Sequence, residues 1–250
     1  MESRLRILGA IIAVIGVIAV LGGGYGYMQV QAGANALQGF SKAQAVKLSY
    51  NADGKLVDRG DTAGADAILA LLKDTWGWPV SQGDLNPNDP TVNTGTEYMY
   101  QMATIAHHTL TGTNTVTLPA QVQYDGNGDG TIDANAPTYT PETLPTGDAY
   151  VASLAADAIY QPGTYTVPTN GRYYSQFNRL NPLDGPARDL AWSGLVQGLF
   201  AELGVGATSF SAIQMGQALA LIAMAFGVTF IITGAGLVWV AMSKKAAIPA

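Results

Sequence analysis

Two long runs of apolar residues stand near the two ends of the chain. The first comprises 22 uncharged residues from Ile7 to Met28, and the second comprises 25 from Ala218 to Met242. A helix needs about 20 such residues to cross the roughly 30 Å hydrocarbon layer of a bilayer, because each residue adds about 1.5 Å. The pattern therefore predicts transmembrane helices over residues 7–28 and 212–242, with the lipid bilayer as a partner.

Each run has an alternative interpretation. A cleaved signal peptide would suit the first run, because Arg4 and Arg6 precede it and the small residues Ala32-Gly33-Ala34 follow it. That site lies more than ten residues beyond Leu21, which favours a retained anchor. The second run would also suit the core helix of a soluble protein, but its length favours a membrane span.

Charges beside the two runs predict the orientation of the chain. Four basic residues flank the spans: Arg4, Arg6, Lys244 and Lys245. By the positive-inside rule, the short ends, residues 1–6 and 243–250, are expected in the cytoplasm. The ends carry a net charge of +3, whereas the segment between the spans carries eight basic and 17 acidic residues, a net charge of −9. We therefore expect a protein of the cytoplasmic membrane whose main domain, residues 29–211, lies outside.

The segment between the spans mixes helical and strand patterns. The first helix is expected to continue through residues 29–44, and the alternation of Val46, Leu48 and Tyr50 before a turn predicts a hairpin. Four further helices are predicted, near residues 63–78, 97–110, 148–160 and 186–203, and one strand over residues 163–168. The expected fold is a membrane protein with two transmembrane helices flanking a mixed α/β, helix-rich extracytoplasmic domain.

The stretch YDGNGDGTID, residues 124–133, places polar side chains at alternate positions between glycines. Calcium takes about six to eight oxygen ligands around a sharp glycine turn. The pattern predicts a structural calcium ion bound by Asp125, Asn127, Asp129, Thr131 and Asp133. The stretch resembles the D-x-N-x-D-G loops of EF-hands, dockerins and thrombospondin-type repeats, but Ala136 stands where an EF-hand has glutamate. A solvated polar turn would use the same residue types, so both interpretations stay open.

The sequence offers few residues for catalysis. It has no cysteine and no G-x-S-x-G turn, and its two histidines, His107 and His108, point about 100° apart on a helix. Glu97, Gln101, Thr104 and His108 share one helical face, which suits a solvated stripe or a hydrogen-bonded core edge better than a metal or catalytic site. We therefore expect no enzyme, and the net charge of −9 argues against binding to nucleic acid.

The segments NPLDGPARDLAWSGLVQGLF and IQMGQALALIAMAFGVTFIITGAGL together resemble the C-terminal half of small two-span envelope proteins of high-GC Gram-positive bacteria. The N-terminal RILGAIIAVIGVIAVLGG fits the same plan. The matching positions are Pro182, Arg188, Ala191, Gly194 and Phe200. Some of those proteins carry a ring-opening-dioxygenase label, but a mononuclear iron site needs two histidines and a carboxylate, which this sequence does not assemble. The resemblance implies a location in the bacterial cell envelope and carries over no catalytic residue.

Small residues are aligned on both predicted spans. On the first span they are Gly9, Ala13, Gly16 and Gly23. On the second span they are Gly216, Ala220, Ala223, Gly227, Gly234 and Ala241, within about 40° of one line. Helices in lipid associate where small residues let their backbones approach. We expect these two stripes to pair within one chain, which leaves the opposite face of the second span, with Ala218, Ala225 and Gly236, for a partner.

Together these patterns favour a non-enzymatic accessory or scaffold subunit of a larger membrane or envelope assembly. Its partners would be other membrane-protein subunits, contacted through the spans or the external domain. The alternative is a calcium-dependent envelope adhesion or surface-binding module. An enzyme or a sensor has the least support from the residue content.

Overall fold

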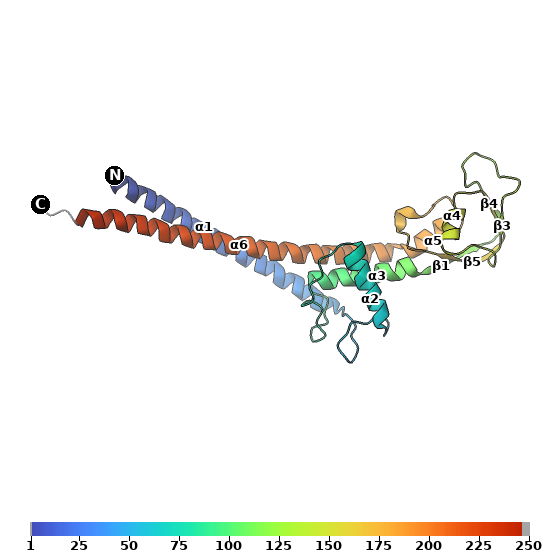
Figure 1. The fold of residues 1–250 in the computed structure, drawn as a ribbon, viewed down its shortest axis with the longest axis horizontal. Helices are drawn as coiled ribbons and strands as arrows, with labels where there is room; N and C mark the ends of the chain where they lie inside the picture. Colours follow the sequence, from blue (N-terminus) through green and yellow to red (C-terminus); the bar gives the residue numbers. More distant parts are fainter. Residues whose placement is uncertain (1, 247–250) are drawn as a thin grey trace. The chain divides into compact units, whose positions relative to one another are not determined.

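The computed structural model describes residues 2–246, which form two compact units (Figure 1). The helical unit comprises residues 2–47, 91–95 and 206–246. The mixed unit comprises residues 48–90 and 96–205. Residues 247–250 of the predicted cytoplasmic C-terminus lie outside the described residues, as do the side chains of Lys244 and Lys245.

The helical unit is built from α1 (Glu2–Gln44) and the later part of α6 (Gly194–Ala246). Both helices are long and apolar enough to cross a membrane. Only 11% of the most apolar window of each helix is buried, unlike the core helix of a soluble protein. The predicted continuation of the first helix through residues 29–44 is confirmed, and α1 ends where Ala45 adopts a φ of 55°.

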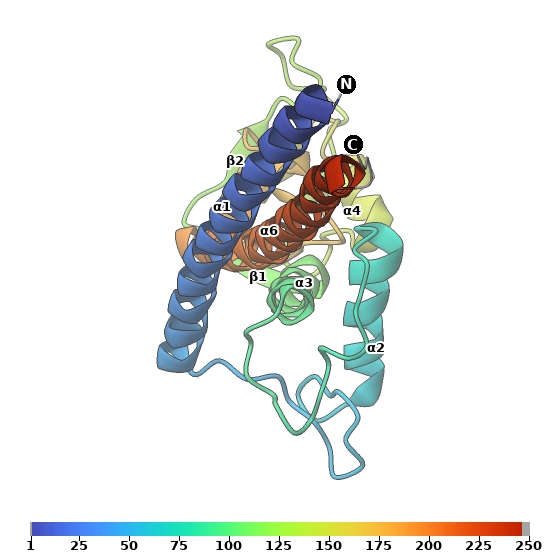
Figure 2. The same cartoon turned by 90° about the vertical axis from the view of Figure 1, so that its left-hand side faces the viewer.

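Helices α1 and α6 lie side by side (Figure 2). Their small-residue stripes pair with each other, as the sequence predicted. A Cβ added at Gly9 would lie 2.7 Å from the carbonyl oxygen of Gly234, and one at Gly16 would lie 2.5 Å from that of Gly227. The corresponding distance from Gly23 to the carbonyl oxygen of Ala220 is 2.9 Å. The helices are therefore antiparallel, and side chains larger than hydrogen at the crossing glycines would push them apart.

Polar contacts mark both ends of this helix pair. Gln217 donates a hydrogen bond from Nε2 to Oε1 of Gln31 over 3.2 Å. At the other end, Nη2 of Arg6 donates to the carbonyl oxygen of Ala241 over 3.3 Å. Long amphipathic side chains commonly reach out of an apolar layer in this way.

The mixed unit contains the remaining elements. Its helices are α2 (Thr62–Ala70), the π-helical turn η1 (Leu71–Thr75), α3 (Gly95–Thr111), α4 (Gly147–Ser153), the 3₁₀ turn η2 (Tyr174–Gln176), α5 (Asp184–Ala191) and the start of α6. Its strands are β1 (Thr113–Leu118), β2 (Val122–Tyr124), β3 (Thr138–Tyr139), β4 (Ala158–Tyr160) and β5 (Gly163–Pro168). The expectation of a mixed, helix-rich region between two apolar helices is confirmed.

Two small sheets organise this unit. In the first, β1 pairs antiparallel with β5, from Thr113 opposite Pro168 to Leu118 opposite Gly163. In the second, β4 is central, antiparallel to β2 and parallel to β3. Alternate residues of β1 and β5 are buried, which is the period expected of a strand with one face on a core.

Several predicted elements differ from the observed ones. The helix predicted over residues 148–160 ends at Ser153, because residues 158–160 form strand β4, in which Ala158 and Tyr160 are fully buried. The helix predicted over residues 186–203 is interrupted at Trp192 and Ser193. There the Ser193 hydroxyl accepts a bond from the backbone N–H of Val196 and caps a new helix, α6. The predicted hairpin is present but short: Tyr50 and Leu56 form an antiparallel bridge, and backbone hydrogen bonds join Val57 to Ser49 and Asn51 to Lys55.

Buried tyrosines dominate the core of the mixed unit. Tyr150, Tyr160 and Tyr165 are fully buried, and each of their hydroxyls has a hydrogen-bond partner. Burial raises the pKa of Tyr160 to about 12 and also raises that of Tyr150. A core built this way depends on polar partners as well as on apolar packing.

Candidate functional site

The predicted calcium loop begins with Asp125, whose two carboxylate oxygens organise the turn. One oxygen accepts from the backbone N–H of Gly128 over 2.6 Å, and the other accepts from that of Gly130 over 2.7 Å. Both glycines have a positive φ, of 76° and 85°, which side chains rarely adopt. The glycines are therefore required by the backbone, whether or not an ion is bound.

The other predicted ligands form successive Asx turns. Asn127, Asp129 and Asp133 each accept a bond from the backbone N–H two residues later, over 2.8 Å in every case. The hydroxyl of Thr131 donates to Asp129 over 2.8 Å. This hydroxyl and the backbone N–H of Thr131 hold the pKa of Asp129 below its usual value. The structure thus brings the five predicted residues into one hydrogen-bonded loop.

Asp157 fastens this loop to the rest of the mixed unit. It is only 6% exposed, and it accepts bonds from the backbone N–H groups of Gly126 over 3.1 Å and Asp133 over 2.7 Å. Gly126 packs so closely on the backbone of Ala156 that a Cβ there would collide with it. Asp157 was missed in the sequence because it lies outside the alternating pattern of the loop.

Hydrogen bonds account for the conformation of the loop. Within residues 2–246, no three His, Cys, Asp or Glu side chains are grouped so that they could hold a metal ion. Calcium also binds amide and backbone carbonyl oxygens, and a grouping of His, Cys, Asp and Glu side chains does not count these ligands. Calcium binding by Asp125, Asn127, Asp129, Thr131 and Asp133 stays a prediction.

The polar face predicted on α3 divides into separate local contacts. Nε2 of His108 lies 2.9 Å from Oδ1 of Asp58, and the hydroxyl of Thr104 donates to the carbonyl oxygen of Tyr100. Glu97 is 1% exposed and lies in the first turn of α3. These side chains do not converge on one centre, so the geometry gives them no shared chemistry.

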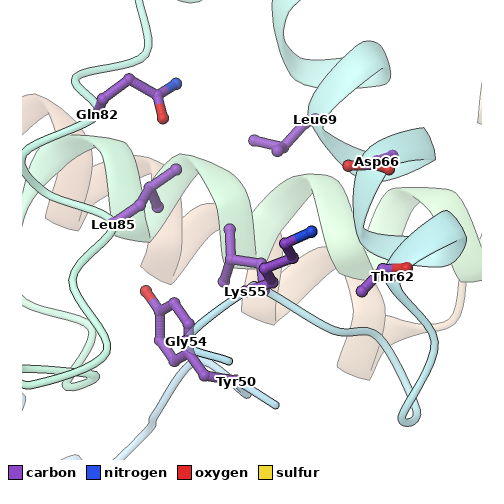
Figure 3. A pocket seen from close by; sticks show the side chains of 9 residues that line it. Tyr50, Gly54, Lys55, Thr62, Asp66, Leu69, Gln82 and Leu85 are labelled. Carbon is purple, nitrogen blue, oxygen red and sulfur yellow. The ribbon is translucent and has the colours of Figure 1, made fainter. Parts of the chain in front are cut away.

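A cavity of about 430 Å³ lies between the Asn51 turn, α2 and the loop around Leu85 (Figure 3). Lys55 and Asp66 bring opposite charges to its wall, beside three leucine side chains. The Tyr50 side chain also lines this cavity, and the hydroxyls of Tyr50 and Tyr100 are buried without a hydrogen-bond partner in the described part of the chain. Burial, with Glu97 adding to it, raises the pKa of Tyr50. The mixed lining favours no single class of ligand.

The strongest polar cluster of the mixed unit joins Arg172 to Asp184. Both guanidinium Nη atoms lie 2.8 Å from the carboxylate, which also accepts from the hydroxyl of Tyr150 and the backbone N–H of Asn178. Arg172 further stacks on the ring of Phe177 at 4.1 Å. Asp184 is fully buried, so the cluster presents no face to a substrate and its role is structural.

Sequence reasoning singled out Pro182 and Arg188 in this region but missed the buried pair. The signal was present in the quoted NPLDGP segment. Asn181 accepts from the backbone N–H groups of Leu183 and Asp184, and it donates to the hydroxyl of Tyr160. A polar residue that lies two or three positions before the start of a helix commonly caps it, as Asn181 does for α5. Arg172, the partner of Asp184, lies outside this segment.

Comparison of this chain with protein-family models, with curated proteins and with solved structures gives no match.

Proposed function

We propose that this protein is a non-enzymatic accessory or scaffold subunit of a larger membrane assembly in a bacterial cell envelope. The observation that carries the proposal is the division of α6 into two small-residue faces. The inner face is used within the chain, where Gly227 and Gly234 cross Gly16 and Gly9. The outer face is left for another helix.

This outer face contains Ala218, Ala225 and Gly236, all of which are exposed. The three residues fall within about 20° of one line at 100° per residue. A Cβ added at Gly236 would meet no atom within 4 Å, so there is open space at this position of the outer face. Small residues aligned in this way let a second helix approach closely, and dispersion and Cα–H contacts then favour association in lipid.

Replacing Ala225 with leucine tests the proposal. We expect the variant to fold as the wild type does, because Ala225 is exposed, but to lose the proteins that co-purify with the wild type from native membranes. Ala235→Leu is the matched control, since Ala235 is also exposed but lies about 80° from the outer stripe. Mass spectrometry of the co-purified proteins gives the result. If Ala225→Leu retains the same partners in wild-type amounts, the outer stripe is not the contact.

The proposed subunit has both termini in the cytoplasm and its mixed unit outside. The supporting observation is the basic character of the ends, with Arg4 and Arg6 before the first span. The chain has no native cysteine, so single cysteines report position without background. We expect an impermeant maleimide to label Ala52→Cys on intact cells but not Ser3→Cys. Labelling at position 3 would reverse the proposed orientation.

Calcium-dependent binding at the envelope surface is the second candidate function, favoured by the alternating Asp and Asn side chains of the loop from Asp125 to Asp133. If the loop binds calcium, the full-length protein in detergent should unfold at a higher temperature with calcium than without it. Linkage gives about 2.7 kcal/mol of stabilisation at a calcium concentration 100-fold above the dissociation constant. Asp129→Ala should abolish the shift, whereas Asp53→Ala, in an exposed turn, should keep it. Equal melting temperatures with and without millimolar calcium would leave the polar turn as the sole interpretation.

A further inference from the structure

A second cavity of the mixed unit, of about 440 Å³, differs from the one in Figure 3 in its charge. Its wall includes Tyr174, Ser175, Arg179, Leu180 and Arg188. The two arginines are the only charged residues among the described residues that line it. The cavity is therefore cationic, whereas the other carries Lys55 and Asp66 together.

The positive charge of this cavity contrasts with the negative net charge of the mixed unit. Residues 48–90 and 96–205 carry 17 acidic and six basic residues. One of the six, Arg172, is neutralised by Asp184. Two of the remaining five line this cavity, and only one of these two, Arg188, is paired within the described residues, with the exposed Asp189, so the local charge favours an anion.

Both guanidinium groups have donors to spare. Arg188 uses Nε and Nη2 on one oxygen of Asp189, at 2.9 and 2.8 Å, and it lies 4.7 Å from the centre of the Tyr174 ring. Arg179 is exposed, and its side chain has no ion pair or hydrogen bond to any described residue. An arginine fork has five N–H donors, and its geometry matches the two oxygens of a carboxylate.

The backbone beneath the arginines is held in place by the buried network. Asn178 donates from its backbone N–H to Asp184 over 2.6 Å and from its side chain to the hydroxyl of Tyr124 over 2.6 Å. Gly185 allows the carbonyl oxygen of Arg179 to pack against α5, because a Cβ at Gly185 would lie 2.6 Å from that oxygen. The site is thus preorganised, which lowers the entropy cost of binding.

The rim of the cavity is apolar as well as cationic. Leu180 is 79% exposed and Tyr174 is 45% exposed. Tyrosine and arginine are the residue types that contribute most to protein interfaces, and an exposed leucine beside them provides an apolar contact. A ligand that suits this surface carries an apolar group next to its anion.

We infer that this cavity binds the carboxylate side chain of an acidic, apolar-flanked segment of a partner protein. The carboxylate lies between Arg179 and Arg188, and the neighbouring apolar side chain of the segment packs on Leu180 and Tyr174. This contact is made by the mixed unit alone and does not depend on the outer stripe of α6. It therefore goes beyond the proposed membrane contact, and either can fail without the other.

The probe is a fluorescent pentapeptide, acetyl-Leu-Glu-Leu-Glu-Leu-amide carrying a dye, titrated with the full-length protein in detergent. We expect saturable binding that weakens as salt is added, because the contact is ionic and open to solvent. Arg179→Gln should weaken binding about tenfold, the size of one charge-assisted hydrogen bond. Lys73→Gln is the matched control: it removes one exposed positive charge from the same unit, away from the cavity, and should leave binding unchanged.

Three results would overturn the inference. The first is equal binding of a peptide with glutamine in place of glutamate, which would show that the carboxylate is not read. The second is peptide binding by both Arg179→Gln and Arg188→Gln that equals binding by the wild type. The third is binding of inorganic phosphate without binding of the peptide, which would assign the cavity to a phosphate group. Unchanged thermal unfolding of each variant shows that a loss of binding is not a loss of folding.

Discussion

Asp184→Ala is expected to lower the free energy of unfolding of the mixed unit by about 3–5 kcal/mol. The substitution leaves the guanidinium of Arg172, which is 6% exposed, without its counter-charge. It also removes the acceptor of the Tyr150 hydroxyl and of the Asn178 backbone N–H. Because a domain of this kind has a total stability of about 5–15 kcal/mol, the loss is a large fraction of the whole. Denaturant unfolding followed by near-ultraviolet circular dichroism of the buried tyrosines measures it.

Two further variants serve as controls for the effect of Asp184→Ala on stability. Asp53→Ala removes an exposed carboxylate from a turn and should change stability by no more than about 0.5 kcal/mol. Arg172→Met combined with Asp184→Leu should recover the part of the loss that comes from the unpaired guanidinium, since replacing a buried ion pair by apolar side chains is often neutral. If Asp184→Ala unfolds at the same denaturant concentration as Asp53→Ala, the buried pair does not stabilise the unit.

Gly227→Leu should force the two long helices apart. A Cβ at this position would lie 2.6 Å from the carbonyl oxygen of Gly16 and 2.8 Å from the backbone nitrogen of Val20, and backbone cannot move aside as a side chain can. Overpacking of this kind costs about 1–3 kcal/mol or more. Cysteines at Gln31 and Gln217, whose side chains are hydrogen-bonded, report the pairing through the yield of oxidative cross-linking. We expect this yield to fall sharply in the variant.

Gly236→Leu is the matched control for that experiment. It makes the same substitution on the same helix, but a Cβ at Gly236 meets no atom within 4 Å. Cross-linking should therefore proceed as in the unsubstituted helix pair. A cross-linking yield in Gly227→Leu as high as in Gly236→Leu would contradict the close packing at Gly16 and Gly227. The comparison separates the inner face of α6, which holds the chain together, from the outer face proposed to hold a partner.

The two experiments act on different layers of the protein. Where α1 and α6 cross, small residues recur every seven positions on each helix, and their backbones are in contact. A single methyl group is already too large at these contacts. The Arg172–Asp184 cluster uses charges that water would otherwise solvate, and it is stable because each of the three guanidinium nitrogens of Arg172 donates to an acceptor. Loss of the glycine contacts would separate the two helices, whereas loss of the Arg172–Asp184 pair would unfold the unit that contains both cavities.

Local pattern determined most of the helices. The apolar runs within α1 and α6 follow from the residues themselves, because an uncharged run of 22 or 25 residues has few other folds. The continuity of residues 194–203 with the second span in α6 was not predicted. The pairing of Gly9, Gly16 and Gly23 with Gly234, Gly227 and Ala220 also followed from spacing, since one helical face fixes which residues can meet. Helix α3 and strand β5 were predicted for the same reason: their periods are visible within a single segment.

Tertiary structure decided the features that need two distant segments. β1 has only Val116 and Leu118 as apolar residues, and it is a strand because β5 supplies its hydrogen bonds. Residues 158–160 have helix-forming neighbours, yet they form β4 because burial between β2 and β3 outweighs local propensity. Asp157 joins its loop, and Arg172 joins Asp184, across intervals of sequence that carry no period. The buried polar contacts of this protein were therefore hidden from its sequence, because a buried charge is stable only beside a partner that folding alone brings near.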